Sequence, residues 1–306
     1  MVPDGKAGHR HLPVVGYTAV RRWRCWLPAS DVDHGTTACQ PEPCMSPTKV
    51  SRMSRLLLIV FAIVLALYLA LCLGLWLFQR SLIYFPQPGA LDSSASRMTL
   101  TVDAVPINVS IRPHDGPKAL LYFGGNAEDV SRNLPEFSAT FPGHALYLLH
   151  YRGFGGSGGS PSEEALAQDA LALFDEVQRT HPQIAVIGRS LGSGVAIRLA
   201  SQRPVARLVL ITPFNSLGEI AARQYPIFPV QWLLRDRFES WRYAPSITVP
   251  TRLIAAQQDD IIPRASTERL YRQFKPGVAS LIVLPGVGHN SISEAPEYRR
   301  QLAEGL

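Results

Sequence analysis

The sequence predicts an α/β fold with a mostly parallel central sheet and helices on both faces. Three observations indicate this class: short apolar segments typical of buried strands, helical segments between them, and polar residues directly after several strands. The predicted strands are residues 119–123, 145–150, 184–187, 207–212, 251–256 and 279–284. The predicted helices are residues 127–137, 163–179, 191–201, 263–274 and 293–304. In such sheets, sites gather at the carboxyl ends of the strands.

Two further segments complete this domain, which we expect to cover residues 82–306. Residues 98–103 and 107–112 alternate apolar and polar positions and predict an opening β-hairpin. Residues 213–243 lack a clean strand pattern and are rich in proline and aromatic residues, so we expect a small lid there. Its candidate substrate-binding residues are Tyr225, Phe228 and Trp232.

Residues 56–78 are wholly apolar or small and predict one N-terminal transmembrane helix ahead of the domain. The run is too long for a typical signal-peptide core, and no Ala-x-Ala site follows it, which favours an uncleaved signal anchor. Lys49, Arg52 and Arg55 precede the run. The positive-inside rule then predicts a single-pass membrane protein with a cytoplasmic N-terminus and an extracytoplasmic catalytic domain, periplasmic in a bacterium.

Residues 1–54 are rich in proline and have no hydrophobic pattern, which is typical of a disordered segment. An over-extended start is the alternative, because Met45 or Met53 would also begin a conventional anchored protein. A start at Met53 would leave Arg55 facing Arg80 across the span and would weaken the prediction of topology.

Composition and charge argue against several functions. The chain of 306 residues has a formal net charge of +6. Its first 55 residues hold eight Lys/Arg against four Asp/Glu, so +4 of that charge lies ahead of the domain. No basic and aromatic stripe follows, and we expect no nucleic-acid binding. Cys39 and Cys44, with Cys25 nearby, fit no common zinc-site spacing, so we expect no metal and no cofactor.

The run Gly188-Arg189-Ser190-Leu191-Gly192 lies between a predicted strand and a predicted helix. G-x-S-x-G in this setting is typical of a nucleophile elbow, a sharp strand-to-helix turn that exposes the serine hydroxyl. The N-terminus of the helix behind Ser190 favours developing negative charge. Ser190 is therefore the candidate nucleophile.

An acid and a histidine follow Ser190 in the order Ser, Asp, His. Asp259 and Asp260 come directly after the predicted strand 251–256, and His289 follows the strand 279–284. We expect His289 to act as general base and Asp259 to orient its imidazole. Asp259 is preferred to Asp260 because it begins a turn, D-x-I-I-P, whose proline opens the next helix. Asp236 is a more remote third option.

The oxyanion hole of such a site needs two backbone N–H groups. One is expected from Leu191, directly after the nucleophile, and the other from Asn126 in the glycine-rich loop after strand 119–123. Asn126 also has the residue type of a helix cap. Residues 150–157 (HYRGFGGS) are rich in glycine but lack a phosphate-loop pattern, so we expect a structural turn with Arg152 bonded to backbone or carboxylate groups.

Six blocks, YFGGNAED, HYRGFGGSGG, GRSLGSGVA, TPFNSL, QQDDIIP and GVGHN, occur in this order. Together they resemble the α/β-hydrolase superfamily, closest to the Bem46-like group with its ABHD13- and ABHD17-type hydrolases. The resemblance implies an α/β-hydrolase fold, a triad of Ser190, Asp259 and His289, and an oxyanion hole of Asn126 and Leu191. The loop departs from the group's usual His-Gly-Asn, since Gly124 stands in place of the histidine.

The expected function is that of a membrane-anchored serine hydrolase that cleaves an acyl ester or thioester through an acyl-enzyme. The group includes protein depalmitoylases, and a membrane anchor places the site near acylated small molecules, lipids or acyl-proteins. An aminopeptidase is the alternative, with Glu219, Glu239 or Asp236 to bind a free amine. A catalytically silent interaction module is the second alternative, although no member of the triad is missing.

Overall fold

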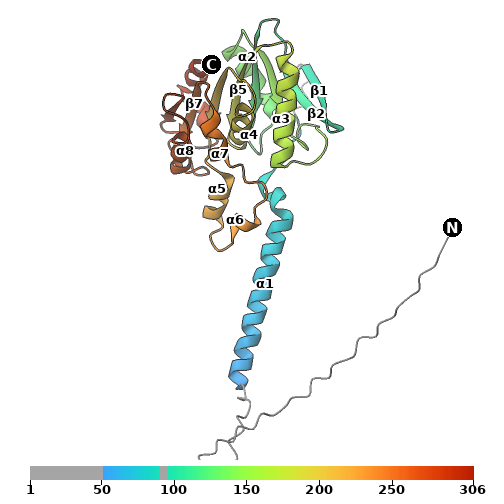
Figure 1. Cartoon of the computed structure of the whole chain (residues 1–306), viewed down its shortest axis with the longest axis vertical. Coiled ribbons are helices and arrows are strands. Elements are labelled where there is room, and N and C mark those ends of the chain that lie inside the picture. The colour runs from blue at the N-terminus through green and yellow to red at the C-terminus, as the bar shows by residue number, and fades with distance from the viewer. Residues whose placement is uncertain (1–50, 90–95) are drawn as a thin grey trace, which may run out of the picture. The chain divides into compact units, whose positions relative to one another are not determined.

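The computed structural model describes residues 51–89 and 96–306 (Figure 1). The predicted N-terminal segment 1–54 lies outside the described residues except for its last four positions, and so do Cys25, Cys39 and Cys44. The first described element is helix α1 (Arg52–Ile83), which contains the whole predicted span 56–78. Most of its side chains are exposed, and among the described elements it is the one helix long and apolar enough to cross a membrane.

Eight strands form one sheet in the described part of the domain, in the order β1-β2-β4-β3-β5-β6-β7-β8. The pairs from β4 to β8 are parallel, and β1 and β2 add an antiparallel hairpin at one edge. The strands are β1 (Ser96–Val102), β2 (Val105–Arg112), β3 (Lys118–Phe123), β4 (Ala145–Leu149), β5 (Gln183–Arg189), β6 (Arg207–Ile211), β7 (Thr251–Ala256) and β8 (Ala279–Leu284).

The predicted hairpin is confirmed, and its turn explains the pairing. Val102 pairs with Val105, which leaves Asp103 and Ala104 as the two turn residues. Their φ angles are +49° and +62°. Two successive positive φ angles match the twist of an antiparallel hairpin, so this short turn sets the register.

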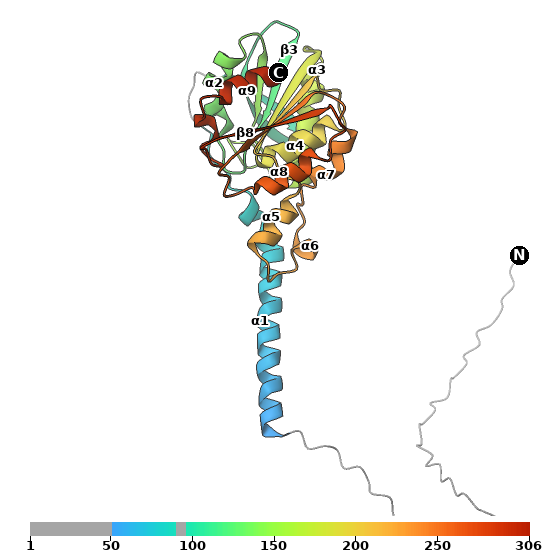
Figure 2. The same cartoon turned by 90° about the vertical axis from the view of Figure 1, so that its left-hand side faces the viewer.

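Helices cover both faces of the sheet. Alternate strand residues enter two separate hydrophobic clusters: Leu121 and Val186 on one face, Leu120 and Ile187 on the other. α3 and α4 pack on the first face and α2 and α9 on the second (Figures 1 and 2). The main helices are α2 (Leu134–Thr140), α3 (Glu163–Gln178), α4 (Leu191–Ala200), α8 (Arg264–Tyr271) and α9 (Tyr298–Gly305), with short 3-10 turns η1 (Val130–Asn133), η2 (Ala244–Ser246) and η3 (Ile292–Glu294).

Two predicted helices begin later along the chain than the sequence pattern suggested. The predicted helix 127–137 is divided into η1 and α2, because Asp129 caps the first turn and a proline stands at the start of the second helix. The predicted helix 293–304 begins only at Tyr298. Ala295 precedes a proline and has ψ of 132°, an extended conformation that ends the η3 turn.

Residues 213–243 lie between β6 and β7 and contain α5 (Leu217–Gln224), α6 (Val230–Leu233) and α7 (Ser240–Tyr243). Ser216 caps α5 by accepting a hydrogen bond from the backbone N–H of Glu219. Both views place α5 and α6 beside the C-terminal part of α1 (Figures 1 and 2). We refer to residues 213–243 as the lid segment.

Candidate active site

Ser190 lies in the turn between β5 and α4 and has an uncommon backbone conformation, with φ of 50° and ψ of −118°. Its N–H donates a hydrogen bond to Ile211 O at 2.8 Å, which fixes the turn to β6. A Cβ on Gly188 would lie 2.4 Å from Gly192 O, and one on Gly192 would lie 2.0 Å from Phe123 O. Side chains at these two positions would prevent the close approach of strand and helix, which explains both glycines of the motif.

His289 connects Ser190 to Asp259. His289 Nε2 lies 3.0 Å from Ser190 Oγ, and His289 Nδ1 lies 2.9 Å and 3.1 Å from the two carboxylate oxygens of Asp259. The side chains of His289 and Asp259 are each only 5% exposed. A neutral imidazole with its proton on Nδ1 donates to Asp259 and leaves Nε2 to accept the serine proton.

The structure places Asp259, and not the two alternative acids, against His289. Asp259 Oδ1 also accepts the backbone N–H groups of Ile261 and Ile262, so the D-x-I-I-P turn holds the carboxylate in place. Asp260 is exposed at the rim of the site. Asp236 is buried against Arg80 in another part of the molecule.

The glycine-rich loop after β3 lies next to Ser190, since a Cβ on Gly125 would lie 3.8 Å from Ser190 Cβ. Asn126 and Leu191 both line the cavity at Ser190. The Asn126 side chain donates to Ile83 O at 2.9 Å, and Asn126 O accepts from Phe85 N at 3.1 Å. These two bonds tie Asn126, the predicted second oxyanion donor, to the end of α1 and to the residues that follow it.

Glu128 holds this loop, and its role was not predicted from the sequence. Its carboxylate accepts Gly125 N–H at 2.7 Å, Tyr122 OH at 2.6 Å and Asn133 Nδ2 at 2.6 Å. Arg189 Nη1 lies 3.7 Å from the same carboxylate. The signal in the sequence is an acid three residues after Gly125, which satisfies the loop N–H in the manner of a helix cap.

The missing histidine of the loop also has a structural explanation. A Cβ on Gly124 would lie 2.6 Å from Val130 Cγ1, so this conformation has no room for a larger side chain there. The loop therefore depends on Glu128 and on the end of α1 instead of on a histidine.

A cavity of about 800 Å³ opens from Ser190, and this volume is within the range of sites for small-molecule ligands. Of the three lid residues proposed for substrate binding, Tyr225 and Phe228 line the cavity, whereas Trp232 is 84% exposed and lies outside the lining. Part of the wall comes from α1, for which the sequence predicted only a role in spanning the membrane. The α1 residues that line the cavity are Leu75, Gln79, Leu82 and Ile83.

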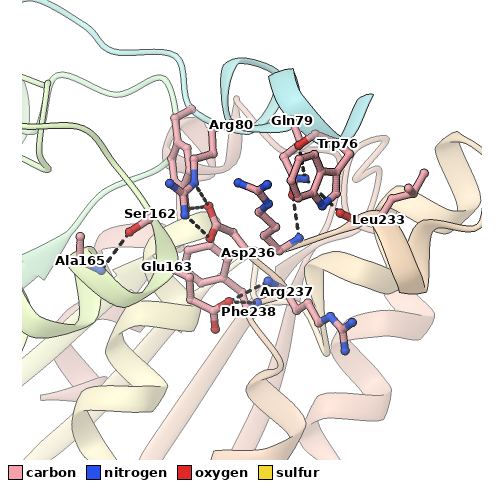
Figure 3. A network of polar contacts seen from close by, with 12 residues as sticks. Trp76, Gln79, Arg80, Ser162, Glu163, Ala165, Leu233, Asp236, Arg237 and Phe238 are labelled. Carbon is pink, nitrogen blue, oxygen red and sulfur yellow. Dashed lines mark hydrogen bonds and ion pairs between the residues drawn. The ribbon is translucent and has the colours of Figure 1, made fainter. Parts of the chain in front are cut away.

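Gln79 joins α1 to the lid segment with both ends of its amide (Figure 3). Its Nε2 donates to Leu233 O at 3.0 Å and to Trp76 O at 2.9 Å, and its Oε1 accepts from Arg235 N at 2.7 Å. The guanidinium carbon of Arg235 lies 3.7 Å from the centroid of the Trp76 ring. Gln79 is 7% exposed, so these bonds are shielded from water.

A second contact between α1 and the lid segment is ionic (Figure 3). Arg80 Nε donates to Asp236 Oδ2 at 3.0 Å, and the Tyr84 hydroxyl donates to the same oxygen at 3.1 Å. Glu163 accepts the backbone N–H groups of Arg237 and Phe238 at 2.7 Å and 2.9 Å. Burial, and then the negative charge of Asp236, raise the pKa of Tyr84 and keep its hydroxyl protonated as a donor.

The turn at residues 150–157 is structural, and Arg152 is bonded as predicted. Arg152 makes a forked pair with Asp169, with Nε 3.0 Å from Oδ2 and Nη2 2.9 Å from Oδ1. Asp169 is fully buried. This pair ties the turn to α3 and contacts no residue of the triad.

Together, the sheet and a serine, histidine and aspartate at its strand ends are the arrangement of an α/β-hydrolase. The family model described as "Serine aminopeptidase, S33" matches residues 137–245. An uncharacterized protein of Mycobacterium tuberculosis, Rv2307c, is 38% identical over 76% of this chain and 87% of its own length. Protein bem46 of Schizosaccharomyces pombe is 26% identical over 76% of this chain and 87% of its own length.

Further similarity extends to enzymes with a stated activity. Lysophosphatidylserine lipase ABHD12 of Gallus gallus is 29% identical over 54% of this chain and 51% of its own length. The Pyrococcus furiosus esterase Pf2001 has the same fold, with a TM-score of 0.58 and 21% identity over 73% of this chain and 96% of its own. The fold, the site and the family model thus define the protein as a hydrolase in class. The chain belongs to the Bem46-like family of the α/β-hydrolase superfamily.

Proposed function

We propose that this protein is a membrane-anchored serine hydrolase that cleaves an acyl ester or thioester through an acyl-enzyme. The observation that carries the proposal is the hydrogen-bonded chain from Ser190 through His289 to Asp259, which opens into a mostly apolar cavity. Ser190 is the nucleophile, His289 the general base and acid, and Asp259 the group that orients the imidazole.

The reaction follows from these positions. His289 Nε2 takes the Ser190 proton while Oγ attacks the acyl carbonyl carbon, and the N–H groups of Leu191 and Asn126 receive the oxyanion. His289 then gives the proton to the departing alcohol or thiol, which leaves the acyl group on Ser190. A water molecule, deprotonated by His289, attacks the acyl-enzyme and releases the acid.

The cavity supports an ester or thioester more than an amino-terminal amide. The three carboxylates considered for amine binding lie outside its lining, and each is paired with an arginine: Asp236 with Arg80, Glu219 with Arg269, and Glu239 with Arg242. The similarity to a lysophosphatidylserine lipase supports acylated lipids as the substrate class.

Labelling with a fluorophosphonate probe tests the proposed nucleophile. We expect the wild-type chain to be labelled, Ser190→Ala to be unlabelled, and ester hydrolysis to fall by about 10⁴-fold or more in that variant. Ser201→Ala, at the other end of α4, is the matched control and should keep both properties. A folded wild type without labelling would contradict the proposal and favour the silent module. A panel of acyl esters, thioesters and aminoacyl amides then separates the esterase from the aminopeptidase.

For localisation, we propose that α1 spans the membrane with the hydrolase domain on the extracytoplasmic side. Arg52 and Arg55 before the apolar run, with Lys49, support this orientation by the positive-inside rule. A C-terminal alkaline phosphatase fusion expressed in bacteria should be active, because that enzyme folds only where disulfides form. An inactive fusion, with a cytoplasmic reporter active at the same position, would reverse the topology.

A further inference from the structure

The lid segment covers one face of α1. Tyr68, Cys72, Leu75 and Gln79 are spaced by four, three and four residues and therefore share a face of the helix. All four are buried or half-buried, whereas most of the helix is exposed. Three of these four residues fall inside the apolar run 56–78. The lid segment therefore contacts α1 within the predicted membrane span and not only at its end.

The deepest contact is at Tyr68. Its hydroxyl donates to Ile227 O at 2.9 Å, and its ring stacks on Phe228 with centroids 5.9 Å apart and planes inclined by 4°. Tyr68 lies ten residues before Phe78, a rise of about 15 Å along an α-helix. The hydrocarbon core of a bilayer is about 30 Å thick. With residues 56–78 across the membrane, residues 227 and 228 lie about halfway into it.

The composition of the lid suits that depth. Residues 225–234 (YPIFPVQWLL) contain no charged side chain, and an arginine stands on either side, Arg223 before α5 ends and Arg235 after α6. Ile227 is 72% exposed and Trp232 is 84% exposed. Large apolar side chains exposed next to a spanning helix are stabilised by lipid, and flanking arginines suit the phosphate groups at the surface.

Most backbone N–H groups of the same segment have a partner, which suits a hydrocarbon environment, where an unpaired N–H is costly. Pro226 and Pro229 have no N–H. The N–H groups of residues 225, 228, 230, 232, 233 and 234 donate to carbonyls within residues 221–230, and that of Arg235 donates to Gln79. The hydroxyl of Tyr68 and the amide of Gln79 supply donors to carbonyls of the segment.

The cavity continues from Ser190 into the space between α1 and the lid segment. Leu75 and Leu82 form its wall on the α1 side, and Phe228 and Leu233 on the lid side. Leu75 lies within the apolar run 56–78, Phe228 stacks on Tyr68, and Ser190 lines the same cavity. The cavity thus extends from the level of the lipid acyl chains to the proposed nucleophile.

We infer that residues 225–234 are inserted in the membrane leaflet beside α1, and that the substrate is a membrane-resident acyl ester whose chain enters laterally between α1 and the lid segment. This inference rests on the proposed function, which supplies the ester chemistry at Ser190. The lid segment is then a fixed portal to the bilayer, and α1 contributes to substrate binding as well as to anchoring.

The first experiment measures the depth of the lid. The full chain is placed in phosphatidylcholine vesicles that contain brominated phosphatidylcholine. The fluorescence of Trp232 is obtained by subtracting the emission of Trp232→Phe from that of the wild type. Quenching of this difference signal is expected with bromine placed in the acyl chains. A difference signal quenched only by a water-soluble quencher, such as iodide, would overturn the inference.

The second experiment separates membrane access from chemistry. Ile227→Asp places a charge at the exposed tip of the lid without altering the cavity lining. We expect hydrolysis of 4-methylumbelliferyl palmitate carried in vesicles to fall about tenfold or more, and hydrolysis of water-soluble 4-nitrophenyl butyrate to stay within about twofold. Tyr271→Asp is the matched control, since Tyr271 is an exposed aromatic residue at the end of α8 and is not among the residues that line the cavity.

The outcomes distinguish this inference from the function on which it rests. If Ile227→Asp and Tyr271→Asp hydrolyse the vesicle-borne ester equally well, lateral entry is contradicted while the hydrolase function stands. If neither ester is hydrolysed in a Ser190-dependent way although Trp232 is quenched by brominated lipid, the hydrolase function fails and lateral substrate entry fails with it.

Discussion

At the scale of single residues, the site depends on positions where the backbone conformation or the absence of a Cβ atom sets the shape of the turn at Ser190. Ser190 has a positive φ, and the two glycines around it have no space for a Cβ. Asp259 uses one carboxylate oxygen for two backbone N–H groups and both oxygens for His289. The single side chain of Asp259 thus holds both its own turn and the imidazole of His289.

Asp259→Asn tests that double role. An amide in place of the carboxylate no longer stabilises an imidazolium and favours the wrong tautomer of His289, so we expect kcat to fall by about 10³ to 10⁴-fold with KM nearly unchanged. Asp260→Asn is the matched control, because Asp260 is the exposed neighbour, and its kcat should stay within about twofold. Steady-state hydrolysis of a soluble ester measures both. An equal loss in the two variants would contradict the assignment of Asp259.

At the scale of elements, α1, the lid segment and the glycine-rich loop after β3 are joined. Gln79 bonds to both sides of the end of α6, Arg80 binds Asp236, and Asn126 binds the carbonyl of Ile83. The end of α1 is therefore part of the support of the site. A change in α1 is expected to reach the lid through these few polar bonds.

Gln79→Leu tests this coupling. The leucine keeps the volume but leaves Leu233 O and Arg235 N–H without their side-chain partner, at a cost of about 1–3 kcal/mol for each buried group left unpaired. We expect faster hydrogen exchange of amides 230–238 by mass spectrometry, with α4 unchanged. Gln87→Leu removes an exposed bond to Phe85 O and is the control without effect on the lid. Unchanged exchange in the lid of Gln79→Leu would show that the polar contact does not hold it.

At the scale of the whole molecule, the domain is a parallel sheet with two buried faces, and its stability depends on pH through groups that it buries. His150 follows β4, is 3% exposed, and bonds through Nε2 to Ser110 Oγ at 2.8 Å. Burial lowers its pKa, and the positive charge of Arg97 lowers it further against the opposing effect of Asp129. The folded state therefore favours the neutral imidazole.

The sign of the pH effect follows from this lowered pKa. Below the ordinary histidine pKa of about 6.5, the unfolded chain binds a proton that the folded chain resists, so the free energy of unfolding should decrease as the pH falls from 7.5 toward 5. His150→Gln should make that decrease shallower in urea titrations, with no change of slope above pH 7.5. A residual slope is expected because burial also lowers the pKa of His144. An unaltered slope in His150→Gln would contradict the prediction.

Much of this protein was determined by local patterns in the sequence. Apolar segments of strand length, the glycines around Ser190, and the order of Ser190, Asp259 and His289 predict the sheet and the residues at its strand ends, because each pattern acts over a few neighbouring residues. The helix breaks at residues 130–134 and 295–298 were missed, since one proline or cap outweighs a favourable pattern on both sides.

Only the tertiary structure decided the contacts between distant segments. Three contacts join residues far apart in the chain: the bond of Asn126 to the end of α1, the pairing of Asp236 with Arg80, and the cover of one face of α1 by the lid segment. An apolar run predicts that a helix is suited to a membrane. It does not predict which face of that helix another segment will cover. That choice depends on packing, and here the packing makes α1 a wall of the cavity at Ser190.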